Sequence, residues 1–142
     1  MGRIIAIDYG RKRVGLAVTD EMKMFATSLG TVHSKDALEF LKTYLSAEKV
    51  ECIVVGEPKQ MNNENSEAAK FIEPFVKLLI KTFPAITVKR YDERFTSKMA
   101  FQTMIDAGLK KKDRQNKELI DSISATIILQ SYMESMQYKK NK

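Results

Sequence analysis

The sequence predicts a single α/β domain in which helices cover both faces of a mixed β-sheet. Short apolar runs rich in β-branched residues recur along the chain, and after the first three of them they alternate with segments of helical periodicity. The early strands can pair as antiparallel hairpins, whereas each later parallel strand requires a crossover. A chain of 142 residues is long enough to bury the core of one such domain, spanning residues 1–142.

Three neighbouring strands are predicted near the N-terminus. Residues 3–8 form an almost continuous apolar run, which is typical of a central strand covered on both faces. A turn over residues 9–13 leads to a second strand at residues 14–19, which is expected to pair back as a hairpin. A third short strand is expected near residues 25–32.

The remaining elements follow from the alternation of periodicities. Apolar spacing predicts a crossover helix over residues 35–48, with Ser34 as a possible cap. A later apolar pattern predicts a helix from about residue 68 to residue 79, which Pro74 is expected to kink or split. The other predicted elements are strands at 51–56 and 86–91, helices at 96–108 and 117–135, and a disordered cationic tail at 138–142.

Composition limits the partner and the compartment. The 24 Lys and Arg residues exceed the 18 Asp and Glu residues, and a net charge of +6 favours a polyanionic partner. The single cysteine, Cys52, lies in an apolar run and is expected to be a small buried residue. His33 has no second His or Cys nearby, so it is interpreted as a turn residue rather than a zinc ligand. No apolar run is long enough to cross a membrane, so we expect a cytoplasmic protein.

Acidic residues stand where the predicted elements converge. Asp8 follows the first strand, and Asp92 and Glu93 follow the last strand. The carboxyl ends of neighbouring parallel strands gather at one edge of an α/β sheet, so these acids are expected to meet. Asp121 precedes Ala125 by one turn of the final helix, on the side that carries small and apolar residues.

A cluster of buried carboxylates predicts a divalent metal site. Each acid alone has an ordinary explanation as a cap, a turn residue or a surface charge, and only their convergence suggests a shared role. Like charges held together are costly unless a cation neutralises them, which favours Mg²⁺ or Mn²⁺. Two such ions roughly 3.5–4 Å apart would support hydrolysis of a phosphodiester bond.

Four sequence blocks carry a resemblance to a known family. Residues 8–20, DYGRKRVGLAVTD, resemble the opening signature of the YqgF family, also described as Holliday junction resolvases. Residues 54–61, 92–94 and 120–130 resemble its glycine–proline–methionine block, its acidic motif and its final helix. The resemblance implies a ribonuclease H-like fold with catalytic, metal-binding acids at Asp8, Glu93 and Asp121. Only this resemblance selects Glu93 over Asp92.

The resemblance also implies a function. It suggests a metal-dependent nuclease that matures the 5′ end of precursor 16S ribosomal RNA, with structured RNA as its partner. Two alternatives are a Holliday junction resolvase acting on branched DNA and a non-catalytic RNA-binding module of ribosome assembly. A junction-cutting enzyme needs two active sites and a pre-rRNA nuclease does not, so a monomer and a homodimer are both compatible. An actin-like ATPase needs two such domains, which this length excludes.

Basic residues near the acids are candidates for substrate binding. Lys12, Arg13 and Arg94 lie beside the proposed carboxylates and can hold flanking phosphates. Gly10 is a turn position where a nucleic acid backbone can approach closely. The run Lys110, Lys111 and Lys112 is either a solvated loop or a grip on the backbone.

Two positions depart from the family pattern. Glu57 stands where an apolar residue is common and adds an acid close to the proposed site. Asn62 and Asn63 replace a pair that usually ends in glycine, although asparagine tolerates positive φ better than most residues. Glu57 therefore places the local charge balance in question.

Overall fold

A computed structural model describes the backbone of residues 2–23, 25–57, 69–93 and 117–140. The side chains of residue 69 and of residues 117–123 and 137–140 lie outside this description. The predicted helix at 96–108, Asn62, Asn63 and Pro58 also fall outside it. The described strands and helices, in chain order, are β1 Arg3–Tyr9, β2 Arg13–Thr19, β3 Ala26–His33, η1 Ser34–Asp36, α1 Ala37–Ala47, β4 Val50–Glu57, α2 Ala69–Thr82, β5 Thr87–Asp92 and α4 Lys117–Lys140.

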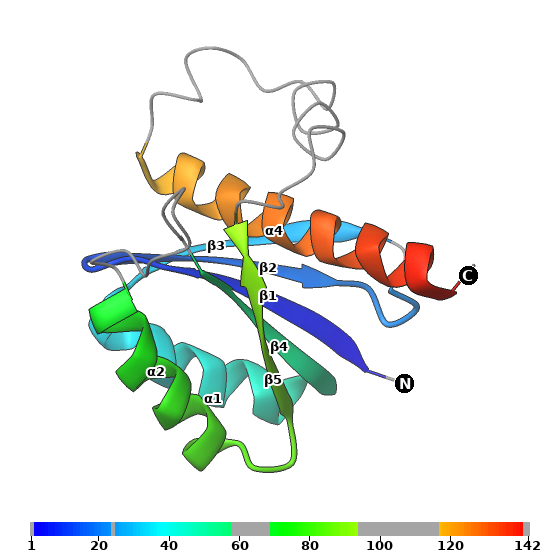
Figure 1. The fold of residues 1–142 in the computed structure, drawn as a ribbon. Coiled ribbons are helices and arrows are strands. Elements are labelled where there is room, and N and C mark those ends of the chain that lie inside the picture. The colour runs from blue at the N-terminus through cyan, green and yellow to red at the C-terminus, as the bar shows by residue number, and fades with distance from the viewer. Residues whose placement is uncertain (1, 24, 58–68, 94–116, 141–142) are drawn as a thin grey trace.

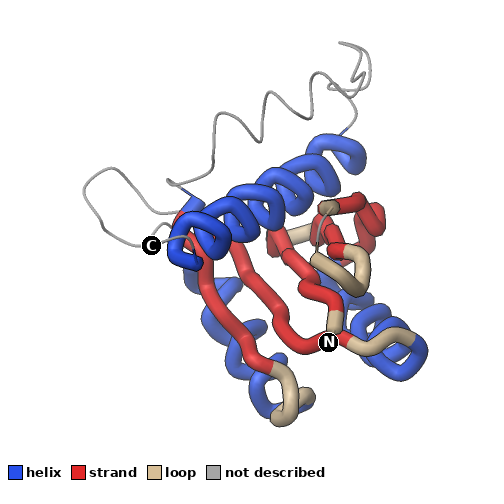
Figure 2. The backbone as a smooth tube through the Cα atoms, turned by 90° about the vertical axis from the view of Figure 1, so that its right-hand side faces the viewer, coloured by secondary structure: helices blue, strands red, loops and turns tan. Residues whose placement is uncertain are grey.

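The strands form one mixed sheet in the order β3-β2-β1-β4-β5. The hairpin strands β1, β2 and β3 pair antiparallel, while β4 is parallel to both β1 and β5. Helices α1 and α2 lie on one side of the sheet and α4 crosses the other side (Figures 1 and 2). The predicted mixed sheet with helices on both faces is therefore confirmed.

Strand alternation divides the core into two layers. In β1, Ile5 and Ile7 are fully buried against α1 and α2, whereas Ile4 and Ala6 pack under α4. Cys52 of β4 belongs to the α4 layer and is a free, buried cysteine, as the sequence predicted. Successive residues of a strand point to opposite faces of the sheet, so this alternation assigns each later residue of β1 and β4 to one of the two faces.

The start of the crossover differs from the prediction. Ser34 does not cap α1, because it lies in a 3₁₀ turn before the helix and Asp36 occupies the N-cap position. Its Oγ donates instead to the carbonyl of Arg11 over 2.8 Å, which ties the β1–β2 turn in place. A 3₁₀ turn, η1, precedes α1, and His33 caps that turn with Nδ1, which accepts from the Lys35 N–H over 3.2 Å. The interpretation of His33 as a turn residue is confirmed.

A kink or a split was expected at Pro74, and helix α2 runs through it without interruption, so the split is wrong. Proline removes the hydrogen bond to the carbonyl four residues earlier, at Lys70. Both Lys70 and Pro74 are exposed, so water is available to that carbonyl. The loss of one bond on the solvent side leaves the buried side of the helix intact.

Helix α4 continues to Lys140, beyond the expected end at residue 135 and into the expected tail at 138–142. Its last turns carry Lys139 and Lys140, and cations near a helix C-terminus interact favourably with the helix dipole. In the part of the chain that the structure describes, no helix is both long and apolar enough to span a membrane.

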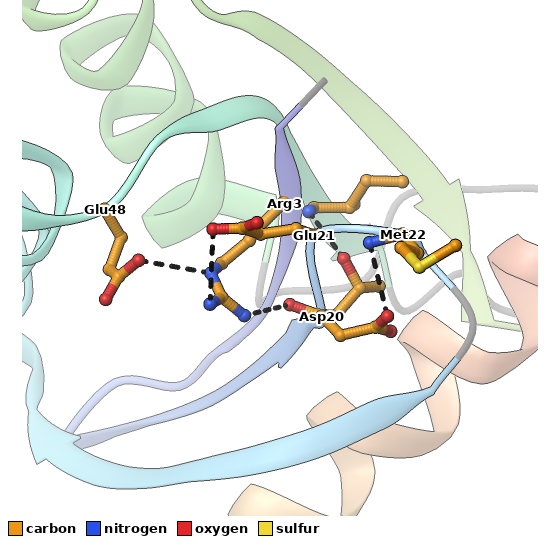
Figure 3. A network of polar contacts seen from close by, with 7 residues as sticks. Arg3, Asp20, Glu21, Met22 and Glu48 are labelled. Carbon is orange, nitrogen blue, oxygen red and sulfur yellow. Dashed lines mark hydrogen bonds and ion pairs between the residues drawn. The ribbon is translucent and has the colours of Figure 1, made fainter.

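Arg3 fastens the start of β1 to its neighbours (Figure 3). Its Nε donates to Glu48 Oε2 over 3.3 Å, and its NH1 group donates to the carbonyl of Thr19 over 3.1 Å. Asp20 orders the adjacent β2–β3 turn by accepting from the N–H of Met22 and of Phe25. These contacts lie at the opposite end of β1 from Asp8.

Two adjacent leucines of α2 test which side of the helix supports the fold. Leu79 is 0% exposed, and we expect Leu79→Ala to lower the free energy of unfolding by about 2–5 kcal/mol through the cavity it leaves. Leu78 is 41% exposed, and Leu78→Ala should change it by less than about 1 kcal/mol. Urea denaturation measures both values, and equal losses would contradict the assigned orientation of α2.

Candidate active site

Asp8 is the next-to-last residue of β1, the central strand of the sheet. It follows Ile4 and Ala6 in the alternation of β1, so its side belongs to the α4 face of the sheet. It is paired across the hairpin with Gly15 of β2, which is buried. The fold thus places this carboxylate at the C-terminal end of β1, the middle strand of the sheet.

Gly56 separates Asp8 from Glu93. Val55 pairs with Ile7, so the next position of β4, Gly56, lies beside Asp8. A Cβ added at Gly56 would lie 2.6 Å from Ile128 Cδ1 and 3.3 Å from Glu93 Cδ. Glu93 and the α4 residue Ile128 therefore occupy the space that a side chain at position 56 would need.

Glu93 carries a strongly perturbed carboxyl. Burial, followed by the negative charges of Asp8 and Asp92, raises its pKa from 4.5 to about 7. The charge of Asp8 contributes to this rise, so the two carboxyls lie close to each other. A cation bound between them would relieve both causes of the rise, so the donor set fits a divalent metal that prefers oxygen ligands.

Glu57 belongs to the opposite face of the sheet. It follows Ile53 and Val55, which pack against α1 and α2, and its Oε1 accepts from NH1 of Arg90 over 2.8 Å. Arg90 also forms an ion pair with Glu73 of α2, in which its NH2 group donates to Oε2 over 2.7 Å. The charge of Glu57 is therefore partnered there, and the concern that it disturbs the candidate site is removed.

Asp121 lies in α4, seven residues before Ile128, and its side chain is outside the described part of the structure. Within the described residues, no group of three or more His, Cys, Asp or Glu side chains is arranged to hold a metal ion. The structure thus brings together Asp8 and Glu93, and it places the backbone of the third candidate on the helix that covers them.

The described basic candidates are Lys12, in the loop between β1 and β2, and Arg13, the first residue of β2. The N–H of Gly10 donates to the carbonyl of Arg13 over 2.9 Å, and a Cβ at Gly10 would lie 2.6 Å from that oxygen. Glycine is therefore required by the turn. The N–H of Ser34 donates to the carbonyl of Lys12, whose side chain is exposed. Arg94, Lys110, Lys111 and Lys112 lie outside the described residues.

Two features of this region were not singled out from the sequence. Gly56 was noted only as part of a motif, although a glycine that ends a buried strand beside an acid-bearing strand is a signal of close approach. The contact of Arg11 with Phe71, described below, joins two segments far apart in the chain. No local pattern reveals such a pair.

A family model and several known proteins match almost the whole chain. The family model described as "RuvX: Holliday junction resolvase" matches residues 2–135. A protein of Flavobacterium psychrophilum is 58% identical over 94% of this chain and 97% of its own length. A protein of Bacteroides fragilis strain ATCC 25285 is 59% identical over 95% of this chain and 98% of its own length. Both carry the name "Putative pre-16S rRNA nuclease".

A solved structure of T. thermophilus RuvC in complex with a Holliday junction substrate matches with a TM-score of 0.58. It covers 96% of this chain and 97% of its own, at 19% identity. At that identity the likeness concerns the fold alone. The expected ribonuclease H-like fold is confirmed.

The space over Gly56 can be tested by a pair of substitutions. We expect Gly56→Ala to lower the free energy of unfolding by about 1–3 kcal/mol, because its Cβ collides with Ile128 Cδ1. Ile128→Val removes that atom, so the double variant Gly56→Ala/Ile128→Val should recover part of the loss. Urea denaturation of all four proteins gives the coupling energy. Strictly additive effects would show that the two residues do not compete for this space.

The crowding of the acids predicts a pH dependence of stability in the metal-free protein. A carboxyl with a raised pKa favours folding while it is protonated, so its contribution is full below about pH 4.5 and is lost as pH rises through about 7. The loss between about pH 4 and about pH 8 is up to about 3 kcal/mol, and Glu93→Gln should lack it. Denaturation in the presence of EDTA measures both proteins, and parallel pH profiles would contradict the prediction.

Proposed function

This chain belongs to the RuvX family, the YqgF family that its motifs indicated, and we propose that it is a metal-dependent nuclease that hydrolyses phosphodiester bonds in structured RNA. Its proposed substrate is precursor 16S ribosomal RNA, which the names of its relatives give, with cleavage at the 5′ end as the sequence resemblance implies. We propose that it acts in the cytoplasm, where that precursor would be met.

One observation carries this proposal. Asp8 and Glu93 share the α4 face of the sheet across Gly56, where burial and mutual repulsion raise the pKa of Glu93 to about 7. A stable fold that holds like charges together at such cost is typical of a site whose function requires them. Lone surface acids or helix caps would have neither the burial nor the repulsion.

We propose that Asp8, Glu93 and Asp121 hold the metal. Bound Mg²⁺ or Mn²⁺, as one ion or a pair, would activate water and stabilise the charge that develops on the scissile phosphate. The chain itself supplies a base for these ligands, because β1 is the central strand, β4 lies between β1 and β5, and α4 covers this face of the sheet. Asp92 is expected to act only through its charge on Glu93.

We propose that basic residues bind the phosphates that flank the cleavage point. Lys12 lies in the loop that directly follows β1 and Arg13 begins β2, with Gly10 leaving the backbone approachable. Arg94 follows Glu93 in sequence, and Lys110, Lys111 and Lys112 precede the helix that contains Asp121. Contacts of this kind fix the register of a nucleic acid without reading its sequence.

Substitution of the acids tests the metal site. Asp8→Asn, Glu93→Gln and Asp121→Asn should each lower the cleavage rate of a precursor 16S rRNA fragment by at least about 100-fold, because each removes a charged ligand. Rates are measured across a titration of Mg²⁺ and Mn²⁺, with a four-way DNA junction as the second substrate. Cleavage of the junction alone would favour the resolvase alternative.

Glu57→Gln is the matched control, because it removes a carboxylate from the end of a neighbouring strand on the opposite face of the sheet. It should retain cleavage within about threefold. If Glu57→Gln is as inactive as Glu93→Gln, the assignment of faces is wrong. If the wild type binds RNA but cleaves neither substrate with either metal, the chain is a non-catalytic binding module.

A further inference from the structure

An arginine and a phenylalanine meet at the edge of the sheet where Asp8 lies. The guanidinium carbon of Arg11 lies 5.4 Å from the centroid of the Phe71 ring, within the range of a cation–π contact. Arg11 is exposed, and Phe71 is 41% exposed to solvent. The ring is therefore partnered by a cation and still open to solvent.

The location of this pair follows from the packing of α2 against β1. Tyr9 stacks on Phe75 with ring centroids 4.3 Å apart, and Phe71 is one helical turn before Phe75. Arg11 follows Asp8 by three residues, so their Cα atoms are at most about 11 Å apart. The Arg11–Phe71 pair therefore lies near the end of the sheet where β1 ends after Asp8, with Phe71 on the α2 side.

The loop that carries Arg11 is held in place. The carbonyl of Arg11 accepts from Ser34 Oγ over 2.8 Å, and the carbonyl of Lys12 accepts from the Ser34 N–H over 2.9 Å. The Gly10–Arg13 hydrogen bond closes the turn. Little conformational freedom of the backbone would be lost when a ligand binds beside it.

We infer that Phe71 and Arg11 form a stacking platform for an unpaired base of a substrate strand that passes the end of β1, an inference that rests on the proposed nuclease function. Aromatic rings and arginine planes are the surfaces on which proteins stack unpaired bases. Three exposed cations lie nearby and suit a phosphate backbone. Lys12 follows Arg11 and Lys70 precedes Phe71 in sequence. Lys35 follows Ser34, whose Oγ donates to the Arg11 carbonyl. A substrate frayed or single-stranded at the cleavage point would be preferred over a continuous duplex.

Tryptophan fluorescence tests this inference directly, because the chain contains no tryptophan. Phe71→Trp places a reporter on the platform. Leu78→Trp places the matched control on the same helix, at a residue with the same 41% exposure. Each variant is titrated in EDTA with a fluorescein-labelled single-stranded oligoadenylate RNA and with a blunt RNA duplex, while anisotropy of the label reports binding separately.

We expect single-stranded RNA to quench the emission of Phe71→Trp and to leave that of Leu78→Trp unchanged, with weaker quenching by the duplex. Phe71→Ala should raise the Kd for the single strand roughly 5- to 150-fold, the range for loss of one base stack. Arg11→Lys keeps the charge and loses the planar group, so it should also raise the Kd while leaving the salt dependence of binding unchanged.

Three results would overturn the inference: unchanged Phe71→Trp emission when anisotropy shows saturation, equal quenching of both tryptophans, or failure of the wild type to bind the single strand. A purely structural Arg11–Phe71 contact predicts a lower urea midpoint for Phe71→Ala with an unchanged Kd. Cleavage of precursor rRNA is measured in a separate assay, so a nuclease without the platform is distinguished from a platform without nuclease activity.

Discussion

Gly56 sets the distance between the two acids because it contributes no side chain between them. Asp8 and Glu93 reach the same face of the sheet from strands on either side of β4, and the space above Gly56 is filled by Glu93 and by Ile128 of α4. A larger residue there would displace either the carboxylate or the helix. A substitution at Gly56 would therefore affect both the packing of α4 and the position of the Glu93 carboxyl.

The alternation of strand residues separates two groups of acids with different properties. On the α4 face, burial and the charges of Asp8 and Asp92 raise the pKa of Glu93. On the α2 face, hydrogen bonds from Arg90 lower the pKa of Glu73, and the same arginine pairs with Glu57. Burial and like charge make the first group costly to ionise, which suits a metal, whereas the second is a network of surface ion pairs around one arginine.

Much of the architecture could be predicted from the sequence, because apolar runs and helical spacing reveal which segments are buried. The five strands, both crossover helices and the placement of Asp8 near the acidic motif follow from such patterns. The cap at Ser34 and the split at Pro74 were wrong, because both depend on contacts or solvent exposure made by other segments. The face of Glu57 and the Arg11–Phe71 contact were not predicted, since each joins distant parts of the chain.

A crystallographic soak with Mn²⁺ tests the shared site most directly, because anomalous scattering locates the ion independently of any assumed chemistry. We expect an anomalous peak within coordination distance of the carboxylates of Asp8 and Glu93, on the face of the sheet covered by α4. A peak beside Glu57 and Asp92 on the α2 face, or no peak near Asp8 at millimolar Mn²⁺, would contradict a metal site built across Gly56.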